Sequence, residues 1–133
     1  MADVALARRW YAEDLKLQAP IRRNRAIVEA FAAVPRERFF GPGPWLVLAD
    51  SCPDRPVVTP DGDARWLYHN VLVTIDQKRG LNNGLPSLWA RNFDHLSLKR
   101  GQRVLQVIVR DAFRIIFDRD GLLPKLLEAA KSG

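Results

Sequence analysis

The sequence predicts a mixed α+β fold, or a truncated α/β fold, built from N-terminal helices, a long irregular loop, a few strands and C-terminal helices. Apolar residues recur at helical spacing near both ends of the chain, and β-forming residues gather in short runs between them. Pro, Asp, Gly and Ser dominate residues 50–63. The length of 133 residues suffices for one domain and not two. We expect a single domain, with an N-terminal region at 1–103 and a buried strand plus C-terminal helices at 104–133.

Bulk composition indicates a soluble globular protein. Apolar residues make up 47% of the chain and charged residues 27%, and no apolar run approaches the roughly 20 residues that span a bilayer. The early acid Asp3 argues against a secretory leader, so a cytoplasmic location is expected, with no membrane partner. The lone cysteine, Cys52, reads as an incidental thiol. A net charge of +6 permits an acidic partner without establishing one.

Two helices are expected before residue 36. Residues 3–17 carry an apolar pattern that ends before Pro20, with Leu6, Trp10 and Leu17 on one face and Tyr11 and Leu15 beside it. Asn24 is placed to cap a second helix whose apolar stripe consists of Ile27, Ala30, Phe31 and Val34.

The basic run before the second helix has two interpretations. Arg22, Arg23 and Arg25 lie where the positive end of the helix dipole opposes them, so they do not serve helix stability. An acidic partner would explain their position, and so would a solvated turn. They are interaction candidates, as are the apolar side chains Trp89, Phe113 and Phe117.

The middle of the chain predicts strands and a helix. Short strands are expected at 45–48 and at 66–75, and the pair Asp61 and Asp63 reads as turn formers. Pro86 suits the first position of a helix, whose buried stripe is Trp89, Phe93 and Leu96 and whose outward residues are Arg91, Asn92 and Asp94. His69 has no second ligand at metal-binding spacing, so no metal site is expected.

The C-terminal part predicts a buried strand followed by helices. The near-continuous apolar run at 104–109 is typical of a central parallel strand covered on both faces. After it, Phe113, Ile116 and Phe117 fall at helical spacing, and a leucine-rich amphipathic helix is expected from 122 to 131.

Several of these segments resemble protein-L-isoaspartate O-methyltransferases. Val34-Pro35-Arg36-Glu37-Arg38-Phe39 is similar to that family's Val-Pro-Arg-Glu-x-Phe signature. Segments 84–91 and 103–107 resemble the helix and the strand that follow in the family, so the likeness covers about residues 20–107 in the right order. The resemblance implies a Rossmann-like unit that binds S-adenosylmethionine, here incomplete because the family's later strands are missing.

The sequence departs from the family at both functional loops. The family strand leads into Gly-x-Gly-x-Gly, where glycine lets the backbone approach the cofactor, but this chain has no glycine at the corresponding positions, which are Ile108, Val109, Arg110, Asp111 and Ala112. No cofactor is therefore expected. The family's substrate loop carries a serine and a glutamine that are absent here. The substrate-binding candidates are Asn82, Asn83 and Ser87, although asparagines at such positions also serve turns.

Three functions follow from these observations. The first is a non-catalytic, methyltransferase-like protein, without catalytic residues, that binds another chain or self-associates and is at least a dimer. The second is an S-adenosylmethionine-dependent carboxyl methyltransferase completed by another chain. The third is a nucleic-acid-binding module whose basic residues are Arg22, Arg23, Arg25, Lys99, Arg100 and Arg103.

Overall fold

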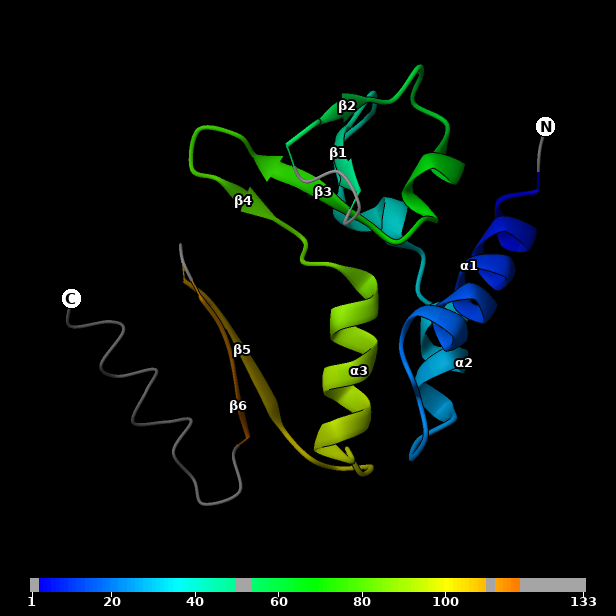
Figure 1. The fold of residues 1–133 in the computed structure, drawn as a ribbon, viewed down its shortest axis with the longest axis vertical. Helices are drawn as coiled ribbons and strands as arrows, with labels where there is room; N and C mark the ends of the chain where they lie inside the picture. Colours follow the sequence, from blue (N-terminus) through cyan, green and yellow to red (C-terminus); the bar gives the residue numbers. More distant parts are fainter. Residues whose placement is uncertain (1–2, 50–53, 110–111, 118–133) are drawn as a thin grey trace. The chain divides into compact units, whose positions relative to one another are not determined.

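The fold is a mixed α+β arrangement that divides into two compact units after Ser97. A computed structural model describes residues 3–49, 54–109 and 112–117, with the backbone alone for 105–109 and 112–117. Unit 1 (Met1–Ser97) holds three α-helices, two short 3₁₀ helices and a four-stranded sheet, and unit 2 (Leu98–Gly133) holds a two-stranded sheet (Figure 1). Each unit is described by itself.

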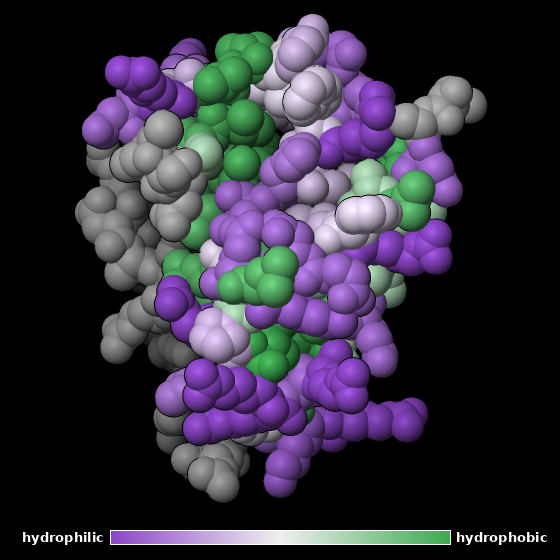
Figure 2. Space-filling model, turned by 45° about the vertical axis from the view of Figure 1, so that its right-hand side comes forward, coloured by the Kyte–Doolittle hydropathy of each residue, from purple (hydrophilic) through white to green (hydrophobic). Residues whose placement is uncertain are grey.

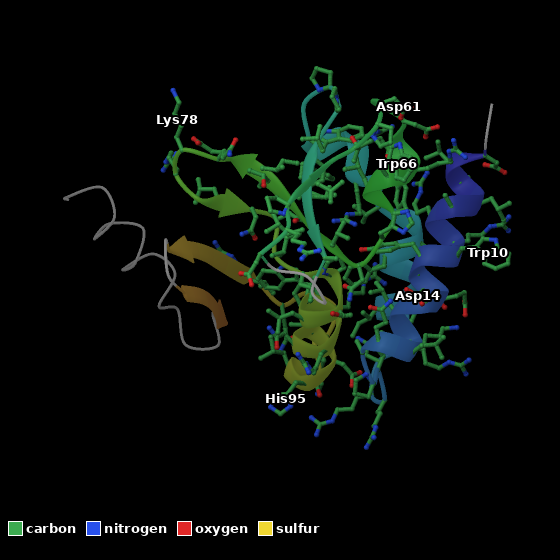
Figure 3. The ribbon with its side chains drawn as sticks, turned by 45° about the horizontal axis from the view of Figure 1, so that its top comes forward. Trp10, Asp14, Asp61, Trp66, Lys78 and His95 are labelled. Atoms are coloured by element: carbon green, nitrogen blue, oxygen red, sulfur yellow. The ribbon has the colours of Figure 1, made fainter. Side chains whose placement is uncertain are left out.

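Helix α1 (Val4–Gln18) confirms the first predicted helix, but it buries a different face. The Asp3 carboxylate accepts hydrogen bonds from the backbone N–H groups of Ala5 and Leu6, at 2.9 and 3.2 Å, and so caps the helix. The buried residues are Tyr11, Ala12 and Leu15. The predicted stripe of Leu6, Trp10 and Leu17 is 43, 71 and 87% exposed, and Figure 3 shows Trp10 projecting from the helix. Apolar residues occupy two faces of α1, and tertiary packing selects the tyrosine face.

Helix α2 (Ala26–Ala33) has Arg25 at its N-cap position, and the Arg25 side chain makes no capping hydrogen bond. Asn24 lies one residue before the N-cap, and its Oδ1 atom accepts a hydrogen bond from the Ala26 N–H at 3.1 Å, so the predicted side-chain bond to the start of the helix is present. Pro35 follows the helix, and the signature residues continue as the 3₁₀ helix η1 (Arg36–Phe39).

The four-stranded sheet of unit 1 is antiparallel throughout. Its order is β2-β1-β3-β4, and the strands are β1 (Leu46–Ala49), β2 (Val57–Val58), β3 (Val71–Asp76) and β4 (Leu81–Asn82). The 3₁₀ helix η2 (Ala64–Leu67) precedes β3. Asp61 and Asp63 are turn formers, as predicted. Asp61 accepts from the Asp63 N–H at 2.9 Å and from the indole N–H of Trp66 at 2.8 Å, and Figure 3 labels Asp61 and Trp66. The Asp63 side chain caps η2.

Helix α3 (Pro86–Leu96) begins at the predicted proline and contacts both other helices. Three small clusters form the core of unit 1 instead of one large one: Tyr11, Leu15 and Tyr68; Ala19, Ile27 and Ala90; Trp45, Leu67 and Val73. The helices supply the second cluster, and the sheet with η2 supplies the third.

Two tyrosines join the signature segment to α1. The Tyr68 hydroxyl donates a hydrogen bond to the Glu37 carboxylate and accepts one from the Arg36 N–H at 3.1 Å. The Arg36 guanidinium lies 5.2 Å from the centre of the Tyr11 ring, and the two tyrosine rings pack edge to face at 5.7 Å. The arginine and the glutamate of the Val-Pro-Arg-Glu segment therefore contact the tyrosines of the core, while Val34 is exposed.

The two tyrosines, which are the only ones in the chain, are expected to titrate late. Burial raises the pKa of Tyr11 and that of Tyr68 to about 12 each. An unfolded tyrosine has a pKa of about 10. The raised values contribute stability that is fully present below pH 10 and is lost as the pH rises through about 12. Absorbance at 295 nm should therefore rise near pH 12 in the native protein and near pH 10 in denaturing urea. A native midpoint near pH 10 would contradict the packing of both rings.

Unit 2 differs from the sequence-based expectation. Strand β5 (Val104–Val109) is present, but it pairs antiparallel with a second strand, β6 (Ala112–Phe117), from Val104↔Phe117 to Val109↔Ala112. The predictions of a central parallel strand and of a helical stripe through Phe113, Ile116 and Phe117 are wrong. Residues 112–117 are rich in β-branched and aromatic side chains, and only two residues separate them from β5, which favours a hairpin. The helix expected from 122 to 131 lies outside the described residues.

Candidate functional site

The substrate-binding candidates from the sequence lie where β4 leads into α3: Asn82 ends β4, Asn83 follows it, and Ser87 is in α3. Asn83 continues the pairing of β3: its Oδ1 atom accepts a hydrogen bond from the Val73 N–H at 2.6 Å, and its own N–H donates to the Val73 carbonyl at 3.1 Å. Asn82 accepts from the Gly84 N–H at 2.9 Å. The sequence left open whether these asparagines bind a substrate or form a turn. Both side-chain oxygens accept hydrogen bonds from backbone N–H groups, as structural asparagines do. A substrate carboxylate would have to use their amide nitrogens.

Ser87 lies in the first turn of α3 and is held by Asn70. The Asn70 Oδ1 atom accepts from the Ser87 N–H at 2.9 Å, and its Nδ2 atom donates to the Ser87 hydroxyl at 3.0 Å and to the Gln18 carboxamide. One side chain thus ties the start of β3 to α1 and α3. Sequence reasoning missed Asn70, because its partners are 17 and 52 residues away along the chain.

Replacing Asn70 by alanine should destabilise unit 1. The substitution leaves the helix N–H of Ser87 without its side-chain acceptor, and we expect a loss of about 1–2 kcal/mol in the free energy of unfolding. Urea denaturation followed by circular dichroism measures it. Asn92→Ala, on the same helix, is the matched control and should change stability by less than about 0.5 kcal/mol. Equal effects of the two substitutions would show that the Asn70 contacts contribute nothing.

The second candidate region is the arginine loop, defined as Arg22, Arg23, Asn24 and Arg25. Its backbone wraps the carboxylate of Asp94 on α3, which accepts from the N–H groups of Arg22, Arg23 and Asn24 at 2.9, 2.8 and 2.8 Å. These hydrogen bonds, led by that from Arg22, hold the pKa of Asp94 below its usual range against the opposing effect of burial. Only 5% of Asp94 is exposed.

The prediction that Asp94 faces outward is wrong. Asp94 lies four residues after Ala90, which is fully buried, so the two share the inner face of α3. The buried stripe of α3 was predicted from apolar residues alone, so the polar residue Asp94 was assigned to the outer face of the helix. The i, i+4 spacing from Ala90 was the available signal.

The arginine side chains of the loop are exposed to solvent. Arg22, Arg23 and Arg25 are exposed, and the Arg23 Nη1 atom donates to the His95 carbonyl at 3.3 Å. Figure 1 draws the α1–α2 connection and the C-terminal end of α3 at the lower end of unit 1, where Figure 3 shows His95. The loop thus presents guanidinium groups on a backbone fixed by a buried carboxylate.

The remaining interaction candidates are Trp89, Phe113 and Phe117, and the structure describes the side chain of Trp89 alone. Trp89 is only 8% exposed, stacks on Phe93 at 5.7 Å and donates its indole N–H to the Asn83 carbonyl at 3.0 Å. Its ring serves the interior of unit 1, not an exposed surface. Phe113 and Phe117 lie in β6, and their side chains are outside the described residues.

Three of the five positions of the degenerate cofactor loop lie in the strands of unit 2. Ile108 and Val109 lie in β5 and Ala112 begins β6. Arg110 and Asp111 lie outside the described residues. Over the described part of the chain, His, Cys, Asp and Glu side chains form no group of three or more that could hold a metal ion. In that same part, every helix is too short or too polar to cross a bilayer.

Comparison with known proteins identifies no relative: no family model, no curated protein and no solved structure matches the chain.

Proposed function

We propose that this chain is a methyltransferase-like protein that acts by binding another protein chain, and in the first instance a second copy of itself, instead of transferring methyl groups. The likeness of residues 34–39, 84–91 and 103–107 to protein-L-isoaspartate O-methyltransferases supports the relationship. On this proposal the chain corresponds to part of a Rossmann-like unit. It would work in the cytoplasm, where a lone thiol stays reduced.

The β5–β6 hairpin is the observation that carries the proposal. In the family, the equivalent strand ends in a glycine-rich loop that cradles the cofactor. Here Ile108 and Val109 continue the strand and pair with Phe113 and Ala112. Branched residues in a paired strand leave no backbone that can approach a nucleoside closely. The geometry therefore favours a loss of cofactor binding.

The same hairpin supports a requirement for a partner. A two-stranded antiparallel sheet by itself is marginally stable in water and gains stability from a third strand or from cover on one face. Each strand has six residues, and in the described part of the chain each has one paired edge. An unpaired strand edge is a template for pairing with another chain. A second copy supplies an identical edge and closes the contact symmetrically.

Sedimentation velocity over a range of concentrations tests self-association. We expect at least a dimer, and we expect Gln106→Pro to shift the protein toward monomer. In a hairpin with a two-residue loop, the closing pair, here Val109 and Ala112, exchanges hydrogen bonds. Hydrogen-bonded and non-hydrogen-bonded pairs alternate along β5, so the N–H of Gln106 faces the outer edge of the hairpin. Proline has no N–H and would block pairing of this edge with a new strand. Gln77→Pro, in the exposed turn after β3, is the matched control and should stay associated.

Calorimetry with S-adenosylmethionine tests the catalytic alternative. Our proposal expects no binding heat and no methylation of an isoaspartyl peptide by the chain alone. A compact monomer at all concentrations would overturn self-association. Cofactor binding accompanied by methyl transfer would instead establish the enzyme.

A further inference from the structure

The arginine loop has a structural feature that the proposed function does not use. Three exposed arginines lie within four residues, on a backbone fixed from below by Asp94. We propose that this loop binds the phosphodiester backbone of a nucleic-acid duplex. The inference is independent of self-association through unit 2.

The arginines of the loop are exposed. The Asp94 carboxylate is buried, and it accepts hydrogen bonds from the backbone N–H groups of the loop. Within the described residues, the side-chain ion pairs are Lys16–Glu13 and Arg65–Asp63, and neither includes an arginine of the loop. A segment running from Pro20 to Val28 contains three arginines and no acidic residue. The positive charge is therefore local, even though it is modest over the whole chain.

Helix α3 extends the positive surface. Arg91 is exposed and lies three residues before Asp94, so it shares the side of the helix that meets the loop. His95 is exposed and follows Asp94 directly, and its carbonyl accepts from the Arg23 guanidinium. Figure 2 shows strongly hydrophilic side chains over the lower part of the face that it draws. The surface thus combines up to four guanidiniums from two elements.

The position of the arginines argues for a ligand. Helix α2 begins at Ala26, so its positive dipole end faces the loop and disfavours cations there. With a polyanion bound, the positive end of the helix dipole and the arginines would both attract the ligand. Asp94 holds the loop backbone, so the points where the three arginine side chains leave the backbone are fixed before binding, which reduces the backbone entropy lost on binding.

The chemistry of the loop favours phosphate and a duplex. All its cations are guanidiniums, whose planar fork matches phosphate oxygens in pairs. Residues 20–28 include no aromatic side chain, whereas binders of single strands stack bases on aromatics. Contacts to a duplex backbone need only positioned cations and carry no sequence preference. An acidic protein segment is the competing ligand.

Fluorescence anisotropy with a labelled duplex of about 20 base pairs tests the proposal, using the full chain at about 50–200 mM salt. The test variant is Arg22→Ala/Arg23→Ala/Arg25→Ala. The matched control is Arg9→Ala/Arg38→Ala/Arg79→Ala, which removes three exposed arginines elsewhere in unit 1. Both variants change the net charge equally and leave residues 98–133 unchanged.

We expect the loop variant to lower the slope of log affinity against log salt by roughly two to three, since each lost phosphate contact lowers it by about 0.9. The control should keep the wild-type slope. Arg22→Ala/Arg25→Ala, which retains the Arg23–His95 contact, should lower the slope by about two-thirds as much as the triple variant does, and it guards against a folding artefact.

Three outcomes would overturn the proposal. The first is no retention of the duplex at low salt. The second is an equal loss in the loop variant and the control, which would mean that binding follows net charge and not this surface. The third is loop-dependent binding of poly-L-glutamate with loop-independent binding of the duplex, which would assign the surface to an acidic protein.

Discussion

Asp94→Asn is expected to lower the melting temperature of unit 1 by roughly 10 °C, which is a large effect for one isosteric side-chain change. The Asp94 carboxylate accepts from three successive backbone N–H groups at 2.8–2.9 Å. A carboxamide keeps one oxygen and turns an NH₂ donor toward those donors. Buried N–H groups left without an acceptor are strongly unfavourable. Thermal unfolding followed by circular dichroism measures the change.

The same contact predicts a defined acid sensitivity. The hydrogen bonds lower the pKa of Asp94 in the folded protein below the unfolded value of about 3.9. A depressed carboxyl pKa contributes stability that is fully present above the unfolded pKa and is lost as the pH falls through the folded pKa. Wild-type stability should therefore fall below about pH 4 more steeply than that of Asp94→Asn. The comparison is made by urea unfolding at each pH.

Asp14→Asn is the control for both measurements. Asp14 is an exposed carboxylate of α1 that contacts the Gln18 side chain one turn away. Its substitution should leave the melting temperature within about 2 °C of wild type, as is usual for surface positions. If Asp94→Asn were as mild as Asp14→Asn, the arginine loop would not be anchored by Asp94, and the preorganisation argued for its guanidiniums would fail with it.

Local signals in the sequence located most elements of unit 1. Asp3, Asn24 and Pro86 mark three helix starts because caps and first-turn prolines act within a few residues. The buried faces were harder to predict. Helix α1 carries Leu6, Trp10 and Leu17 on one side and Tyr11 and Leu15 on another, and only the partners from other elements decide which side is covered.

The candidate sites depend on contacts that no local pattern encodes. Asn70 binds groups on α1 and α3, and Asp94 binds a loop about 70 residues earlier in the chain. Both are polar residues that face other elements of unit 1. A prediction from the apolar pattern would place them at the surface. The same limit explains β6: Phe113, Ile116 and Phe117 fit helical spacing, but pairing with β5 determines their conformation.

Gly84→Ala is expected to destabilise unit 1 by about 2–4 kcal/mol, through two separable effects. Gly84 has a φ of +72°, a left-handed conformation that disfavours any side chain by about 1 kcal/mol. A Cβ atom built there would also lie 2.2 Å from Nε1 of Trp89. The indole is 8% exposed and donates to the Asn83 carbonyl, so it has little room to move. Overpacking of this kind costs about 1–3 kcal/mol.

Gly80→Ala separates the two effects. Gly80 has a similar φ of +66°, and a Cβ atom there meets nothing within 4 Å, so only the backbone effect of about 1 kcal/mol is expected. Urea denaturation of both variants gives the difference, which isolates the contact with Trp89. If the two variants lost equal stability, the indole would yield to a methyl group. The turn that holds Asn82 and Asn83 would then be loosely packed, and its asparagines could turn toward a ligand.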